Sequence, residues 1–100
     1  MLDLTPTKLF LKDIDAFESN QALYKKIVKA LAFLQENPSH PGLHIERIIN
    51  DPTAWSIRVD RGYRISIDSK AYNEPGTPDW NKGILLLRIL DHDDLYKTPR

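Results

Sequence analysis

The sequence contains no cysteine, and this absence removes two kinds of architecture at once. A disulfide framework and a cysteine-ligated metal site both require thiols, so neither can stabilise this chain. Glycine is also scarce, with 4 residues in 100. None of these glycines stands in a glycine-rich phosphate loop or in the GxSxG turn of a hydrolase. The sequence therefore offers no sign of a nucleotide-binding loop or a serine-hydrolase active site.

Net charge and long apolar runs are missing as well. The 14 basic residues balance the 14 acidic ones, whereas a dedicated nucleic-acid binder usually carries a basic excess, although a local basic patch can suffice. No stretch approaches the roughly 18 apolar residues of a membrane span. The segment Met1–Pro6 lacks the basic and apolar regions of a signal peptide. We expect a cytoplasmic protein, without membrane association, that forms a single domain over residues 1–100.

Helical periodicity dominates the first part of the chain. The Thr5-Pro6 pair is a helix-start signal. Apolar residues at helical spacing then predict a first helix over residues 6–18. A second apolar stripe predicts another helix, which must end before Pro38 because proline cannot continue the hydrogen-bond ladder. We expect the two helices to form an antiparallel hairpin.

Period-two alternation replaces the helical pattern after Pro41-Gly42. Strands are expected at residues 44–49, 55–59, 63–67 and 84–90. The turn Asp60-Arg61-Gly62 joins two of them into a hairpin. Residues 69–83 contain two prolines and two glycines and are expected to form a long loop. The predicted fold is therefore α+β: an N-terminal two-helix hairpin packed on a twisted antiparallel β-sheet.

The two faces of this sheet differ in chemistry. One face is apolar and suits the helices, whereas the opposite, exposed face receives Ser56, Arg58, Arg64 and Ser66. Two arginines on adjacent strands form a local cationic patch, and arginine is the side chain best suited to bidentate phosphate contact. Alternatively, both arginines are solvated or paired with carboxylates such as Asp68.

A histidine and a tyrosine follow the last strand. His92 stands among carboxylates, which suits general acid–base chemistry. Tyr96 lies four residues later, on the same face if this segment is helical. The alternative is a loop histidine and a tyrosine that packs against the sheet edge.

No metal site is expected. His40 and His44 have HxxxH spacing, but the intervening Pro41-Gly42 prevents the helix that would bring them together on a metal. The aspartates around His92 lack the glycine and the distal glutamate of a calcium loop. We therefore expect neither a metal nor another cofactor.

Taken together, these motifs resemble the RelE/ParE toxin superfamily. The matching segments are Trp55-Ser56-Ile57-Arg58-Val59, Gly62-Tyr63-Arg64-Ile65 and the ending His92-Asp93-Asp94-Leu95-Tyr96. The resemblance covers about residues 7–97 and implies the toxin of a type II toxin–antitoxin system, with a cognate antitoxin as protein partner.

The activities within that superfamily differ. RelE-like members cleave mRNA, usually on the ribosome and without metal, and this implies a metal-independent endoribonuclease. ParE-like members inhibit DNA gyrase, and a related domain is associated with UvrD-type helicases. A non-catalytic binding module therefore stays open as the alternative. It is favoured by the neutral charge and by the absence of the lysines that RelE carries where this chain has Trp55, Ser56 and Ile57.

The nuclease branch implies particular site residues. Arg64 matches the arginine that contacts the scissile phosphate, with Arg58 as a second phosphate contact. His92, the expected acid or base, and Tyr96, expected to orient the phosphate or stack on a base, match a histidine and an aromatic of YafQ-like members. The supporting residues are Asp94, which, or else Asp93, would tune His92, and His44, a loose match to an upstream histidine.

Three lysines on the second predicted helix complete the candidates. Lys25, Lys26 and Lys29 could attract an acidic antitoxin segment. The alternative is a solvated face of an amphipathic helix.

Overall fold

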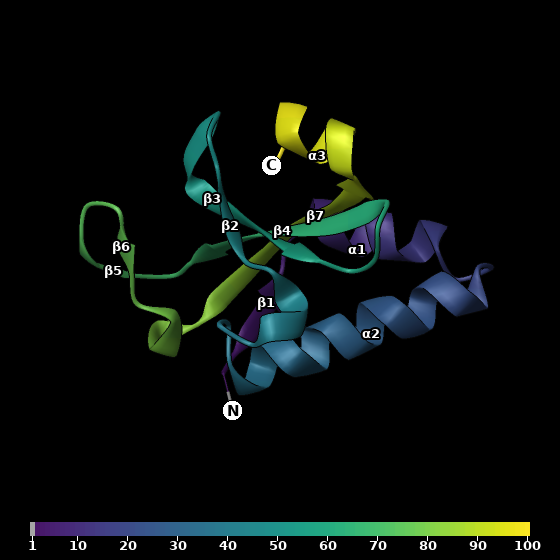
Figure 1. Ribbon diagram of the computed structural model, residues 1–100, viewed down its shortest axis with the longest axis horizontal. Coiled ribbons are helices and arrows are strands. Elements are labelled where there is room, and N and C mark those ends of the chain that lie inside the picture. The colour runs from purple at the N-terminus through teal and green to yellow at the C-terminus, as the bar shows by residue number, and fades with distance from the viewer. Residues whose placement is uncertain (1) are drawn as a thin grey trace.

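The centre of the molecule is a five-stranded sheet in the order β1-β7-β4-β3-β2. The computed structural model describes residues 2–100 (Figure 1). Its elements are β1 (Leu4–Pro6), α1 (Lys8–Ala16), α2 (Gln21–Glu36), the 3₁₀ turn η1 (Pro41–Leu43), β2 (Glu46–Ile48), β3 (Asp51–Arg58), β4 (Tyr63–Ser69), β5 (Tyr72–Glu74), β6 (Thr77–Pro78), the 3₁₀ turn η2 (Trp80–Lys82), β7 (Ile84–Asp91) and α3 (His92–Lys97).

The order of elements at the start of the chain differs from the expected one, because a strand precedes the helices. Thr5 and Pro6 do not begin a helix but lie in β1, which pairs in parallel with β7, so the sheet is mixed rather than antiparallel. The helix begins two residues later than expected because the hydroxyl of Thr7 accepts a hydrogen bond from the backbone N–H of Phe10 at 3.2 Å. Proline is tolerated in β1 because this strand lies at the sheet edge. The α+β class is confirmed, with a strand before the helices.

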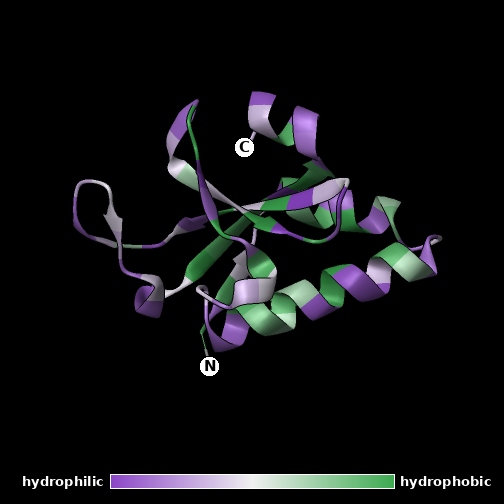
Figure 2. Ribbon diagram, in the orientation of Figure 1, coloured by the Kyte–Doolittle hydropathy of each residue, from purple (hydrophilic) through white to green (hydrophobic). Residues whose placement is uncertain are grey.

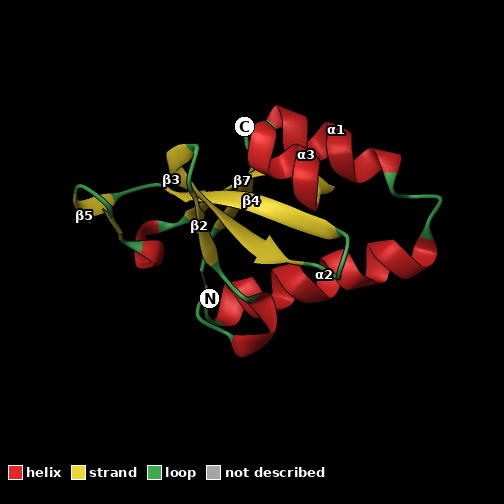
Figure 3. Cartoon of the chain, turned by 45° about the horizontal axis from the view of Figure 1, so that its top comes forward, coloured by secondary structure: helices red, strands yellow, loops and turns green. Residues whose placement is uncertain are grey.

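The two N-terminal helices pack in different places. α1 packs most closely against β7, whereas α2 lies across one face of the sheet (Figures 1 and 3). Both helices nevertheless contribute to one core, since Phe10 of α1 belongs to the same apolar cluster as Leu23 and Ile27 of α2. Asn20 begins α2 by accepting a hydrogen bond from the N–H of Leu23 at 3.1 Å. No helix within residues 2–100 is long and apolar enough to cross a membrane.

The main core lies between α2 and the sheet. Ile57, Ile65 and Ile67 on the sheet and Ile27 and Leu34 on α2 are fully buried there, and the hydrophobic parts of the ribbon gather on these elements (Figure 2). The face predicted to suit the helices is thus the core face.

The opposite face is covered more than expected. Leu95 of α3 is fully buried in a second, smaller apolar cluster with Ala54 and Leu87. Ser56 and Ser66 are 1% and 0% exposed. The expectation that this whole face is exposed is therefore wrong, because α3 and the residues after it pack on it.

The segment expected as a long loop has structure of its own. Residues 70–83 contain the short antiparallel pair β5-β6 and the turn η2. Gly76 adopts a φ of 82° between the two strands, in a region that L side chains rarely adopt. The hairpin extends away from the rest of the chain in Figure 1.

Candidate functional site

α3 brings the predicted histidine and tyrosine together. Asp91 caps the helix by accepting a hydrogen bond from the N–H of Asp94 at 2.9 Å, and the N–H of His92 donates to the carbonyl of Gly62 at 2.8 Å. The second of these bonds joins the start of α3 to the turn between β3 and β4. The rings of His92 and Tyr96 lie in contact, with centroids 4.4 Å apart. The helical arrangement considered from the sequence is therefore present.

The hydroxyl of Tyr96 has two polar partners. It lies 3.1 Å from the Oγ atom of Ser56 and donates to the carboxylate of Glu46 at 2.9 Å. Burial raises the pKa of Tyr96, and the Glu46 carboxylate raises it further, although Ser56 and Arg64 act in the opposite direction. The phenol therefore keeps its proton at neutral pH and acts as a hydrogen-bond donor.

Glu46 was not identified from the sequence. It lies on the edge strand β2, directly opposite Ser56 on β3, and its side chain is on the same face of the sheet as Tyr96. The parity of the β2–β3 hairpin could have indicated this residue. However, the register shifts between Arg47 and Ile48, and such an irregularity cannot be read from an alternating pattern.

The two predicted arginines face each other across β3 and β4. Arg58 is the cross-strand partner of Arg64. Arg64 is held by its turn, since its Nη1 atom donates to the carbonyls of Asp60 at 2.5 Å and Tyr63 at 3.0 Å. Among residues 2–100, Nε and Nη2 of Arg64 have no hydrogen-bond partner, and Arg58 forms neither a hydrogen bond nor an ion pair. Guanidinium donors of both residues thus stay available to an anion.

The carboxylate considered as their partner is engaged elsewhere. Asp68 pairs with Arg100 at 2.9 Å, and Arg100 also pairs with Asp51 at 2.6 Å. The hydroxyl of Ser66 donates to the carbonyl of Pro99 at 2.5 Å. These contacts hold residues 99–100 against the sheet face. Because Asp68 is paired with Arg100, it does not neutralise Arg58 or Arg64.

The two supporting residues lie less favourably. The carboxylate beside His92 is that of Asp93, at 3.4 Å from Nδ1, and the side chain of Asp94 makes no hydrogen bond with the ring in the described part of the chain. His44 follows η1 in the left-handed region, with a φ of 46°. Within residues 2–100 it forms no hydrogen bond with Arg58, Arg64, His92 or Tyr96. Residues 2–100 contain no group of three or more histidine, aspartate or glutamate side chains arranged to hold a metal.

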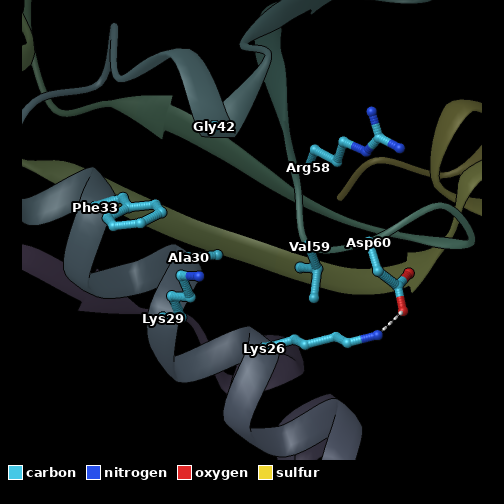
Figure 4. A pocket seen from close by; sticks show the side chains of 8 residues that line it. All are labelled: Lys26, Lys29, Ala30, Phe33, Gly42, Arg58, Val59 and Asp60. Atoms are coloured by element: carbon cyan, nitrogen blue, oxygen red, sulfur yellow. Dashed lines mark ion pairs between the residues drawn. The ribbon is translucent and has the colours of Figure 1, made fainter.

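A groove of about 320 Å³ that shares Arg58 with the site lies between α2 and the β3–β4 turn (Figure 4). Its lining residues are Lys26, Lys29, Ala30, Phe33, Gly42, Arg58, Val59 and Asp60. Lys26 is 3.7 Å from the carboxylate of Asp60, and the ammonium of Lys29 lies 5.6 Å from the ring centroid of Phe33. The groove therefore combines an apolar floor with an excess of positive charge, and Lys25 does not line it.

Comparisons with known proteins concern the fold of the chain. No family model matches the sequence, and no curated protein matches it. Among the solved structures that are similar are the following two. The YoeB dimer from Staphylococcus aureus matches with a TM-score of 0.64 and 18% identity, over 91% of this chain and 97% of that one. A copper-bound mutant toxin from Helicobacter pylori matches with a TM-score of 0.64 and 18% identity, over 95% of this chain and 99% of that one. The chain therefore shares the fold of these two solved structures over nearly its whole length.

Proposed function

We propose that this chain is the toxin of a type II toxin–antitoxin system and acts as a metal-independent endoribonuclease on mRNA. The observation that carries the proposal is the grouping of the four predicted side chains with Glu46. Arg58 and Arg64, with free guanidinium donors, share one sheet face with Glu46 and Tyr96, and His92 lies against the Tyr96 ring. Such a group can bind a phosphate and move protons around it.

The chemistry requires three contributions. The 2′-hydroxyl of the substrate attacks the adjacent phosphorus, the bond to the 5′-oxygen breaks, and the products are a 2′,3′-cyclic phosphate and a 5′-hydroxyl. We assign the exposed carboxylate of Glu46 to accept the proton of the 2′-hydroxyl and His92 to donate a proton to the departing 5′-oxygen. Arg64 and Arg58 stabilise the charge that develops on the phosphate.

Tyr96 has a supporting role in this scheme. Because its pKa is raised, the phenol stays protonated and can donate a hydrogen bond to a phosphate oxygen. A donor that turns from Glu46 to the phosphate also leaves that carboxylate free to accept a proton. The same ring can stack on a nucleobase.

Cleavage of RNA tests the proposal. Translated mRNA is analysed in cells that express the wild type, His92→Ala, Arg64→Ala or Glu46→Ala, and the purified proteins are tested on RNA with and without ribosomes. Removing a positioned acid or base should slow cleavage by about 10²–10⁴-fold. The control variants Lys12→Ala on α1 and Glu74→Ala on β5 change exposed charges outside the site and should cleave normally. Undiminished cleavage by both His92→Ala and Arg64→Ala contradicts the assigned roles.

A non-catalytic binding module is the second candidate, either a gyrase inhibitor or a helicase-associated domain. It is favoured by the zero net charge and by the use of Arg64 Nη1 in bracing the hairpin turn. Expression would then cause growth arrest with DNA-damage signalling and intact mRNA, or no toxicity. Transcript profiling after expression separates the two candidates.

The groove beside α2 is our proposed contact for the antitoxin. An acidic segment carrying an apolar side chain would match its floor and the positive charges of Lys26, Lys29 and Arg58. Lys26→Glu combined with Lys29→Glu should weaken co-purification with the product of the adjacent gene. Lys25→Glu is the matched control because Lys25 does not line the groove. Equal binding by both variants contradicts this placement.

A further inference from the structure

A second hollow, of about 280 Å³, adjoins the candidate site at the edge of the sheet. Its walls are Glu46, Arg47, Ile48, Ile49, Asn50 and Tyr96. Two of these residues, Glu46 and Tyr96, are hydrogen-bonded to each other in the site described above. The others belong to β2 and the turn that follows it. Whatever fills this hollow therefore lies directly beside the proposed reaction centre.

The walls combine apolar surface with a small number of polar groups. Ile48 is 1% exposed and belongs to the floor, whereas Ile49 at the turn is 94% exposed. A single exposed isoleucine is ordinary on a protein surface. Here it lines the same hollow as the aromatic side chain of Tyr96, and apolar and aromatic side chains with a few polar groups are the usual lining of ligand sites.

Asn50 is the polar group best placed to read a ligand. Its Nδ2 atom donates to the carbonyl of Tyr96 at 3.4 Å, which leaves a second N–H and the Oδ1 acceptor without a partner in the described part of the chain. Arg47 is less available, because it donates to the carbonyl of Pro52 at 3.2 Å and its guanidinium lies 5.8 Å from the centroid of the Trp55 ring.

We propose that this hollow is a nucleobase subsite that prefers adenine in the single-stranded RNA next to the cleaved phosphate. The inference rests on the proposed function and adds the base specificity. Adenine offers a donor and an acceptor on one edge, N6 and N7, and an asparagine amide pairs with both, whereas guanine offers two acceptors there. The purine ring system also covers more of Tyr96 and Ile49 than a pyrimidine does, which favours stacking.

Binding of short RNA tests this subsite without requiring cleavage. The probes are uridine hexanucleotides with adenine, guanine, cytosine or uridine at the third position and 2′-deoxy sugars throughout the cleavable positions. Fluorescence anisotropy should give roughly tenfold tighter binding of the adenine probe by the wild type. Asn50→Ala should reduce that preference to less than about twofold with unchanged affinity for the all-uridine probe. Ile49→Ser should weaken binding of both purine probes.

Matched variants show whether the effects belong to the hollow. Asn73→Ala on β5 removes an exposed amide elsewhere, and Val28→Ser on α2 removes an exposed apolar side chain, so both should keep the wild-type preference. His92→Ala should lose cleavage and keep the adenine preference. Thermal unfolding of each variant checks that the fold is intact, and the exposure of Ile49 and Asn50 makes a folding defect unexpected.

The outcomes separate this inference from the nuclease proposal. Cleavage by a wild type whose base preference survives Asn50→Ala overturns the subsite and leaves the nuclease proposal standing. An adenine preference that Asn50→Ala abolishes, in a protein that cleaves no RNA, supports the subsite and overturns the nuclease. A wild type that binds all four probes equally, or none of them, overturns the subsite.

Discussion

Replacing Asp13 should destabilise the protein strongly, because its largely buried carboxylate has three hydrogen-bond donors. The Asp13 carboxylate on α1 accepts hydrogen bonds from Nε of Arg88 at 2.7 Å, from Nη2 of Arg88 at 3.0 Å and from the backbone N–H of Ile89 at 3.0 Å. The carboxylate therefore accepts a backbone hydrogen bond from the edge of β7, as a neighbouring strand would, beyond the point where β1 ends. The hydrogen bonds that Arg88 donates to Asp13 also raise the pKa of Arg88, although burial opposes this.

The magnitude follows from the degree of burial. The side chains of Arg88 and Asp13 are 20% and 11% exposed. Breaking a fully buried pair costs about 3–5 kcal/mol and losing a surface pair costs about 0–1 kcal/mol, so this pair should cost about 2 kcal/mol. The unpartnered N–H of Ile89 adds about 1 kcal/mol. We expect Asp13→Ala to lower the free energy of unfolding by about 3 kcal/mol, or Tm by roughly 12–24 °C for a domain of this size.

Urea denaturation followed by circular dichroism measures this difference. Asp15→Ala is the matched control, because Asp15 lies on the same helix with an exposed side chain and should change stability by less than about 0.5 kcal/mol. Asp13→Asn should fall between the two, since an amide oxygen can still accept from Ile89. A loss below about 1 kcal/mol for Asp13→Ala would refute the reasoning that this carboxylate completes the edge of β7.

Three further predictions concern the sheet face opposite the core. Arg100→Ala should lower the free energy of unfolding by about 1 kcal/mol, because its exposed pairs are weakened by solvent. Burial alone would raise the pKa of Asp51, but hydrogen bonds from Arg100 and Thr53 lower it below 3.8. The stability from this ionised carboxylate is thus present above about pH 4 and lost as the pH falls through its folded pKa, so acid titration of unfolding should abolish the Arg100→Ala difference. Burial, followed by its hydrogen bond to Asp68, raises the pKa of Tyr72 to about 12. The resulting stability is complete below about pH 10 and lost as the pH rises through 12, and stability curves for Tyr72→Phe should lack this alkaline slope. Tyr96→Phe should cut RNA cleavage at least about tenfold while leaving the melting temperature within a few degrees, and an unchanged rate would remove its hydroxyl from the mechanism.

Local periodicity was sufficient to predict the core. Alternation in β3 and β4 placed Ile57, Ile65 and Ile67 on the buried face, and each is 0% exposed. Helical spacing predicted α2 and the position of its end. These patterns are reliable because each depends only on residues near in sequence, and burial of one face stabilises the element that produces it.

The candidate site divides in the same way. His92 and Tyr96, four residues apart, could be placed together from the sequence because a single helical turn joins them. Glu46 could not, since it reaches Tyr96 from 50 positions away through a strand whose register shifts. The sequence left open whether Asp94 or Asp93 lies beside His92, and the structure places the carboxylate of Asp93 there, 3.4 Å from Nδ1.

Tertiary structure alone decided which segments meet. Thr5 and Pro6 carry a helix-start signal, yet they form β1 because β7 offers a free edge to pair with. The hydroxyl of Thr7 then donates to the carbonyl of Leu87, 80 positions along the chain. The amino-acid sequence by itself determined the periodicity of each element and the residue types of the site. Pairing between distant segments determined the mixed sheet, the cover over Ser56 and the position of Glu46, because the free energy of such contacts depends on partners that no local pattern contains.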